Sequence, residues 1–358
     1  MSPHRVFHPA LEENTRCDAL IVGGGITGSF VAERLTRQGL DVILVDREHP
    51  GRGSTTASTA MLLWEIDQSL TELAARYGFE RATRAYRASF AAVGGLKSLI
   101  ASLGIACDLR DRQSLYLAAG DTAQGLVEEH RLRSRAGLPG TFLDHAQLLD
   151  AHEVARAGAI VSPGSCDTDP VAMAYGLLQI ATARGARLFD AEAIAFDAAS
   201  RSVAVALDNG RQIEAGSVIL ATGYAMPDIV HTTLQKVSSS WAIATVPQPD
   251  NLWRDGALIW EDSDDYLYAR TSAGGRIIIG GEDSDEVVAT DARDDLIPVK
   301  SRILTDRLKA LWPRGTRDRF PLGWHLRYHG RRPAAGRSRA RPERHLCRLW
   351  LRRQRYHL

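Results

Sequence analysis

The sequence predicts a mixed α/β protein of about two domains, and three observations lead to this class. The chain has 358 residues, at roughly 150 per domain, and its 44% hydrophobic content is ample for a buried core. Residues 17–48 read as strand, helix and strand in turn. Residues 203–214 and 266–280 instead have the alternation and the central glycines of antiparallel hairpins.

The first predicted unit lies within residues 17–48. Residues 19–22 are apolar and short, as in a buried parallel strand. Apolar side chains then recur at helical spacing over residues 26–40, Gly39 is placed to end that helix, and residues 42–45 form a second buried strand. The result is a βαβ unit, whose crossover is right-handed in nearly all proteins.

The next segments predict mainly helices. Residues 51–60 are small and polar and read as a loop that enters a helix near Met61. A helical pattern runs with interruptions over residues 71–103. A strand at residues 114–118 then precedes an amphipathic helix with a solvated face at residues 124–135.

The second half predicts one more helix and several strands. Asp169 and Pro170 are placed as the N-cap and the first residue of a helix that ends before Gly185. The first hairpin turns at residues 209–210, and the second turns at residues 274–275. Between them, residues 218–221 form a short buried strand.

The composition excludes several classes of protein. No apolar run approaches the ~20 residues of a bilayer-spanning helix, and residues 1–16 lack the pattern of a secretory signal, so we expect a soluble, cytoplasmic protein. Cys17, Cys107, Cys166 and Cys347 form no CxxC pair and are expected to be lone buried thiols. The eleven histidines form no metal-ligand pattern, so no metal is expected.

The turn of the βαβ unit carries the first chemical signal. Gly23, Gly25 and Gly28 form GxGxxG between a strand and a helix. In that setting the first glycine permits a tight turn, the second lets a pyrophosphate approach the backbone, and the third lets helix and strand pack closely. The amides of Ile26 and Thr27, at the positive end of the helix dipole, favour a phosphate group.

An acidic residue completes this motif. Asp46 lies 21 residues beyond Gly25 and ends the second strand, where a carboxylate accepts hydrogen bonds from a ribose diol and disfavours a 2′-phosphate. The strand, the helix and the acidic residue at this spacing together predict a Rossmann-like dinucleotide site. The alternative is a glycine-rich turn without a ligand.

Two later segments favour FAD over NAD. The loop at residues 51–61 offers hydroxyl groups and amides as a second phosphate cradle, and residues 218–223 end a buried strand on small residues, as a backbone close to a cofactor requires. Either segment alone is equally compatible with an ordinary loop. The residues predicted to bind the cofactor are Gly23, Gly25, Ile26, Thr27, Gly28, Asp46, Arg47, Ser54, Thr55, Ser58, Thr59, Ala60, Ala221, Thr222 and Gly223.

From residue 18 to residue 312 the sequence resembles the FAD-dependent oxidoreductases of the D-amino acid oxidase type. The resemblance is carried by VGGGITG with Asp46, by GSTTASTAML, by the ATG at residues 221–223 and by YLYARTSAGGRIIIGGED at residues 266–283. It implies a discontinuous FAD-binding domain, residues 17–80 and 150–235. It also implies a mixed antiparallel-sheet substrate domain, residues 81–149 and 236–313, which makes the second domain α+β.

The same resemblance implies oxidation of a C–N bond in an amine or amino acid, with hydride transfer to flavin N5 and no general base. It implies that Arg270 holds a substrate carboxylate, at the end of a Tyr-x-x-x-Arg strand, and makes Tyr266 and Tyr268 weaker substrate-binding candidates. For Arg270 the alternative is a surface arginine. Trp64 and Glu65 are as well explained by core packing as by the active site. Whether oxygen or a quinone reoxidises the flavin stays open.

The last segment, residues 314–358, does not fit the rest. It holds 14 arginines, no lysine and only two acidic residues. A shifted reading frame explains this composition, because the next frame permits the family's GYGGNG ending, and it predicts weak FAD binding. The alternative is a genuine basic tail for nucleic acid or an anionic membrane, and we expect no nucleic-acid partner. Two other functions stay open: an inactive remnant that binds only the ADP half of FAD, and an NAD-dependent dehydrogenase.

Overall fold

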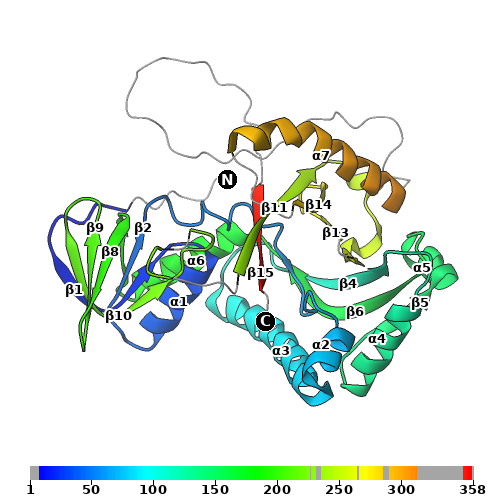
Figure 1. The fold of residues 1–358 in the computed structure, drawn as a ribbon, viewed down its shortest axis with the longest axis horizontal. Helices are drawn as coiled ribbons and strands as arrows, with labels where there is room; N and C mark the ends of the chain where they lie inside the picture. The colour runs from blue at the N-terminus through cyan, green and yellow to red at the C-terminus, as the bar shows by residue number, and fades with distance from the viewer. Residues whose placement is uncertain are drawn as a thin grey trace.

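The computed structural model describes residues 8–225, 227–230, 235–263, 266–284, 290–312 and 350–356. Two β-sheets lie beside one another, each covered by helices (Figure 1). One sheet has six strands and the other has nine. The predicted α/β class, with a mixed second sheet, is confirmed.

The six-stranded sheet contains the βαβ unit. Its order is β7-β2-β1-β10-β9-β8; the four strands from β7 to β10 are parallel, and β9 and β8 are antiparallel to their neighbours. The strands are β1 (Thr15–Val22), β2 (Val42–Asp46), β7 (Arg187–Asp190), β8 (Ala193–Ala198), β9 (Val203–Leu207) and β10 (Gln212–Leu220). Helices α1 (Ile26–Arg37) and α6 (Pro170–Ala183) pack on one face through apolar residues such as Ala32 and Leu178.

Most local predictions for this sheet are confirmed. The strand–helix–strand pattern of residues 17–48 forms β1, α1 and β2, and Gly39 follows the end of α1 with φ +82°. The hairpin at residues 209–210 joins β9 to β10. The strand predicted at residues 218–221 is the end of β10, which runs without a break from Gln212.

The nine-stranded sheet has the order β15-β11-β14-β13-β12-β4-β6-β3, and β5 also pairs with β6. Its strands are β3 (Met61–Leu62), β4 (Arg110–Ala118), β5 (Thr141–Asp144), β6 (Gly158–Asp167), β11 (Gln235–Ala244), β12 (Leu258–Asp262), β13 (Leu267–Thr271), β14 (Ile277–Ser284) and β15 (Trp350–Tyr356). The hairpin predicted around residues 274–275 joins β13 to β14.

Helices cover the nine-stranded sheet from two sides (Figure 1). On one side α7 (Thr290–Leu311) buries Leu304 and Leu308 against alternate strand residues such as Ile259 and Ala269. On the other side, residues of α4 such as Leu126 pack against Tyr116 and Trp260. The remaining helices are α2 (Leu70–Tyr77), α3 (Phe79–Leu103), α4 (Gln124–Arg135) and α5 (His145–His152).

One prediction in this region needs correction, and one is confirmed. Met61 begins the short strand β3 rather than a helix, because Met61 and Leu62 pair with Asp167 and Cys166 of β6. The helical pattern predicted with interruptions over residues 71–103 is confirmed: it forms two helices, and Gly78 separates α2 from α3 with φ +83°.

The sheet topology also differs from the predicted domain boundaries. Strands β3 and β6 fall within residues 17–80 and 150–235, yet both pair within the nine-stranded sheet. The reason is non-local pairing: β6 runs antiparallel to β4, and β3 is the last strand beyond β6. We retain the two-part division as a proposal, with β3 and β6 moved to the second part.

Cys17, Cys107 and Cys166 are free and buried, as expected, and Cys347 lies outside the described residues. Within the described part of the chain, no helix combines the length and the apolar character of a membrane span. Most of the arginine-rich segment also lies outside the described residues; its residues 350–356 pair antiparallel with β11 as β15. The frameshift therefore stays a hypothesis, which the coding sequence from codon 300 onward tests.

The N-cap of α6 gives a first testable prediction. The Asp169 carboxylate accepts hydrogen bonds from the amides of Val171 at 2.9 Å and Ala172 at 3.0 Å. Replacing Asp169 by alanine leaves both amides without this acceptor and is expected to lower the free energy of unfolding by about 1 kcal/mol. Urea denaturation followed by circular dichroism measures the change. Asp169→Ser, which keeps an acceptor oxygen, should lose much less, and equal losses would contradict the capping role.

Candidate functional site

A cavity of about 440 Å³ opens where β1, β2 and β10 of the six-stranded sheet end. Its walls bring together the three predicted cofactor segments, which are far apart in sequence. The predicted residues that line it are Gly23, Gly25, Ile26, Thr27, Asp46, Arg47, Ser54, Thr55, Ala221, Thr222 and Gly223. Gly28, Ser58, Thr59 and Ala60 are not in its lining.

Two glycines of the motif are required by close packing. A Cβ at Gly28 of α1 would overlap the carbonyl oxygen of Gly23, so only glycine allows α1 to approach the turn this closely. Gly23 has φ +109°, and a Cβ there would overlap the carbonyl oxygen of Ala221 at the end of β10. The glycine turn therefore packs directly against the ATG segment at the end of β10.

The N-terminus of α1 faces the hydroxyl-rich loop. Gly25 is the N-cap residue and provides no side-chain cap, and the amide of Ile26 donates to Thr55 Oγ1 at 2.9 Å. A Cβ at Gly25 would lie 3.2 Å from the same oxygen. The helix end, with its positive dipole, is therefore open to the cavity except for one hydroxyl group, an arrangement suited to a phosphate.

Asp46 ends β2 at the edge of this cavity. Its Oδ2 accepts from the amide of Gly24 at 2.6 Å, and its Oδ1 accepts from the amide of Glu48 at 2.9 Å. Burial raises the pKa of the Asp46 carboxyl above its ordinary value, against the two amide hydrogen bonds, which lower it. Since each carboxylate oxygen has two lone pairs, both oxygens still have the capacity to accept from a ribose diol.

The rest of the hydroxyl-rich loop has a local role. Ser58 Oγ accepts from the amide of Ala60, which has φ +52°. This turn leads directly into β3, whose residues pair with β6. Ser58, Thr59 and Ala60 therefore connect the cavity to the nine-stranded sheet and do not border the cavity.

Sequence reasoning missed two walls of the cavity. Residues 191–196, at the start of β8, and residues 227–229 line it as well. Ile194 and Ile229 are 60% and 53% exposed and both line the cavity, so an apolar surface lies at the site. The first wall follows β7, which pairs with β2 as far as Asp46, so its position was set by non-local strand pairing and not by a sequence motif.

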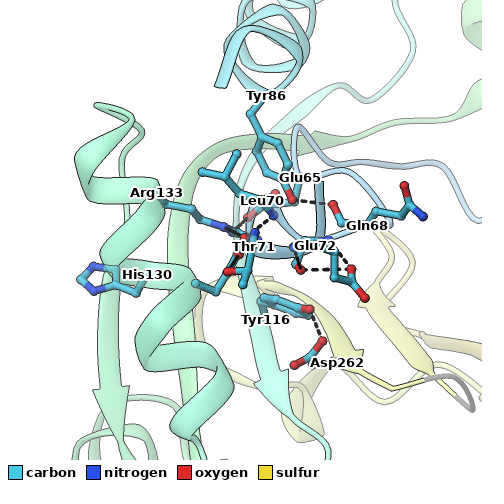
Figure 2. Close-up of polar contacts among 12 residues, drawn as sticks. Glu65, Gln68, Leu70, Thr71, Glu72, Tyr86, Tyr116, His130, Arg133 and Asp262 are labelled. Carbon is cyan, nitrogen blue, oxygen red and sulfur yellow. Dashed lines mark hydrogen bonds and ion pairs between the residues drawn. The ribbon is translucent and has the colours of Figure 1, made fainter. Parts of the chain in front are cut away.

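Trp64 and Glu65 belong to the interior. Trp64 is fully buried and donates its indole N–H to the carbonyl of Pro163 at 2.8 Å. Glu65 accepts a short hydrogen bond from Ser114 and lies beside Arg133 (Figure 2). Between the two explanations left open by the sequence, the structure selects core packing.

Glu65 is part of a buried polar cluster around Arg133 (Figure 2). Arg133 of α4 is 1% exposed and donates from Nε to Glu129 at 2.7 Å. The Glu129 carboxylate also accepts from the amides of Leu70 and Thr71, so it occupies the N-terminus of α2. The cluster joins α2, α4 and β4, and nothing in it opens to the cavity.

Arg270 lies at the end of β13 and is 8% exposed, so it is not a surface arginine. It points to the sheet face opposite α7, together with Tyr268, since Leu267 and Ala269 take the α7 face. Tyr266 and Tyr268 stack with ring centroids 5.6 Å apart. Arg270 Nη1 donates to Asp167 of β6 at 3.2 Å. Tyr266, Tyr268 and Arg270 are not in the lining of the 440 Å³ cavity.

Comparison with known proteins agrees with this geometry. A family model described as "FAD dependent oxidoreductase" matches residues 18–351, which extends beyond residue 312, where the motifs alone placed the end of the resemblance. Gamma-glutamylputrescine oxidoreductase of Escherichia coli is 26% identical over 300 residues, 77% of this chain and 68% of that protein. A putative Rieske 2Fe-2S protein of Bacillus subtilis is 27% identical over 190 residues, 53% of this chain and only 36% of that protein.

Solved structures share the fold. Glycine oxidase from Geobacillus kaustophilus superimposes with a TM-score of 0.66 at 19% identity, over 83% of this chain and 78% of that chain. L-alpha-glycerophosphate oxidase from Mycoplasma pneumoniae, solved with FAD bound, has a TM-score of 0.66 at 17% identity, over 84% and 79% of the two chains.

Proposed function

The chain belongs to the family of FAD-dependent oxidoreductases, and from this premise we propose that it oxidises the C–N bond of a small amine or amino acid. The fold alone does not choose the substrate, since its structural relatives are named for glycine and for glycerophosphate. The sequence relative that covers most of the chain is named for gamma-glutamylputrescine, an amine. That name and the buried Arg270 favour a nitrogen substrate with a carboxylate.

The observation that carries the proposal is the fit of the cavity to the ADP half of FAD. Gly23 and Gly28 are packed so closely that no side chain is possible, and Gly25 opens the end of α1 to a pyrophosphate. Asp46 has acceptor capacity for the ribose, and Ile194 and Ile229 offer an apolar surface to the adenine.

When bound, the flavin supplies the acceptor for the hydride that leaves the carbon of the C–N bond, and the nitrogen lone pair completes the imine. The protein's part is then to bind and align the substrate. Arg270 would hold the carboxylate through two parallel hydrogen bonds, with Tyr266 and Tyr268 on the same sheet face. No side chain is required as a general base.

This function is tested by mixing the FAD-loaded protein with amines and amino acids without oxygen and following the flavin absorbance. Loss of the oxidised flavin band with at least one amine is expected. If FAD binds but no amine reduces it, the chain is the inactive remnant. If extraction of the purified protein yields NAD instead of FAD, it is a dehydrogenase of another kind.

Asp46 gives a pH prediction. The carboxylate must be ionised to accept from both ribose hydroxyls, and its pKa is raised in the folded protein. FAD affinity is therefore expected to fall on acidification, at a pH above that at which an ordinary aspartate is protonated. Asp46→Asn should weaken FAD binding about tenfold at pH 7.5, the effect of losing a hydrogen bond to a charged group, and should remove this pH dependence.

Quenching of flavin fluorescence measures both effects. The exposed Asp197 of β8 provides the control, because Asp197→Asn should leave the affinity and its pH profile unchanged. An unaltered pH profile in Asp46→Asn would show that another group causes the dependence.

A further inference from the structure

Three arginines surround one buried carboxylate in the nine-stranded sheet, where β4 begins and β6 and β13 end. Asp167, the last residue of β6, is fully buried. Arg110 of β4 grips it with two hydrogen bonds, Nε to Oδ1 at 2.9 Å and Nη2 to Oδ2 at 2.6 Å. Arg270 donates to Oδ2 at 3.2 Å, and Arg112 Nε lies 3.4 Å from Oδ1. We call Arg110, Arg112 and Arg270 the arginine cluster.

The arginine cluster has a surplus of positive charge. Guanidinium groups stay protonated in proteins, so three positive charges face the single negative charge of Asp167. Among the described residues, no other acidic side chain forms an ion pair with these three arginines. Their remaining partners are backbone carbonyls, Asp255 for Arg112 and Thr271 for Arg110. Two positive charges are therefore left without a counter-charge in a largely buried position.

Part of the hydrogen-bonding capacity of the cluster is also unused. The Nε atoms of Arg112 and Arg270 are buried and have no hydrogen-bond partner. The side chain of Arg112 is 14% exposed and that of Arg270 is 10% exposed. Buried donors are normally satisfied, and an unsatisfied one is costly. A ligand carboxylate would supply the missing charge.

The chain connects the arginine cluster to the loop that lines the cofactor cavity. Asp167 pairs with Met61 of β3, and β3 directly follows the loop that carries Ser54 and Thr55 into the cavity wall. After Asp167 the chain enters α6, which packs on the same sheet face as α1. The two segments next to the cluster, the loop before β3 and helix α6, thus both lead to the six-stranded sheet.

We propose that the arginine cluster is a subsite for a dianion, so that the substrate class of this enzyme is amino acids with two carboxylates. This inference rests on the proposed function for the reacting amine, while the subsite itself rests on the geometry of Asp167 and its arginines. One surplus positive charge is that of Arg270, which would bind the carboxylate already assigned to it. The second is shared by Arg110 and Arg112, which would bind a further carboxylate of the substrate.

The subsite is tested by isothermal titration calorimetry of the full chain with glutarate as the dicarboxylate probe. Butyrate is the monocarboxylate control, and 1,4-diaminobutane is the cationic control. Glutarate is expected to bind at least tenfold more tightly than butyrate, and the diamine should not bind. Arg112→Gln should weaken glutarate binding at least tenfold. Arg131→Gln, which changes an exposed arginine of α4 paired with Glu128, should leave it unchanged.

Arg112→Lys covers the case in which the glutamine variant does not fold. It keeps the charge but loses the planar fork, so it should weaken glutarate binding less than Arg112→Gln does and more than Arg131→Gln does. Equal affinity for glutarate and butyrate, or unchanged glutarate binding in the folded Arg112 variants, would overturn the inference and leave the cluster a structural one.

The experiments distinguish a failure of the dianion subsite from a failure of the proposed amine oxidation. Flavin reduction by an amine in a protein that shows no preference for glutarate overturns the dianion subsite and leaves the amine oxidation intact. Tight glutarate binding in a protein whose flavin no amine reduces supports the subsite and overturns the oxidation.

Discussion

Replacing Gly28 by alanine is expected to abolish FAD binding and to lower the free energy of unfolding by about 3 kcal/mol. The added Cβ would overlap the Gly23 carbonyl oxygen and lie 3.1 Å from the Gly23 carbonyl carbon. These are backbone atoms, which have no rotamer with which to move aside. Either α1 shifts away from β1 or the glycine turn is displaced, and both movements disturb the amide end of α1 that faces the cavity.

Gly94 provides a matched control for this substitution. It also lies inside a helix, α3, and a Cβ there would have no atom within 4 Å. Because alanine is the better helix former, Gly94→Ala should raise the free energy of unfolding by roughly 0.5–1 kcal/mol and leave FAD binding unchanged. Urea denaturation and flavin fluorescence measure the two quantities. If both variants behave alike, the close approach of α1 to the turn is not what fixes glycine at position 28.

Replacing Glu129 by glutamine is expected to lower the free energy of unfolding by about 3 kcal/mol. The change keeps the shape of the side chain but removes the negative charge that pairs with Arg133, whose guanidinium is almost completely buried. Glutamine also has one acceptor oxygen where the carboxylate has two. The amides of Leu70 and Thr71 and the hydroxyl of Thr71 then compete for it with Arg133 (Figure 2).

Glu128, next to Glu129 in α4, tests whether burial causes the predicted loss of stability. Glu128 lies on the same turn of α4, but its ion pair with Arg131 is exposed. Such pairs contribute little, because water and salt screen them, so Glu128→Gln should not change the urea midpoint measurably. If Glu128→Gln and Glu129→Gln lower the free energy of unfolding equally, burial of the Glu129–Arg133 ion pair is not the cause of the effect.

The amino-acid sequence by itself determined the features that depend on neighbouring residues. The βαβ unit follows from short apolar runs and a helical period, and the start of α6 follows from Asp169 and Pro170. The glycine spacing and Asp46 predicted a cofactor site at this turn for the same reason, because each glycine answers a local steric demand. The segments that line the cavity were found where they carry glycines or clustered hydroxyl groups.

Only the tertiary structure decided which distant segments meet. Strands β3 and β6 carry weak patterns of their own; β6 was placed by its pairing with β4, and β3 by its pairing with β6. Trp64 and Glu65 were undecided until their neighbours from α3, α4 and β4 closed around them. Asp167 lies 57 residues from Arg110 and 103 from Arg270. The balance of charge in such a cluster depends on long-range packing, because the strand order decides which charged groups are buried together. The local periodicity of the sequence contains no information about that order.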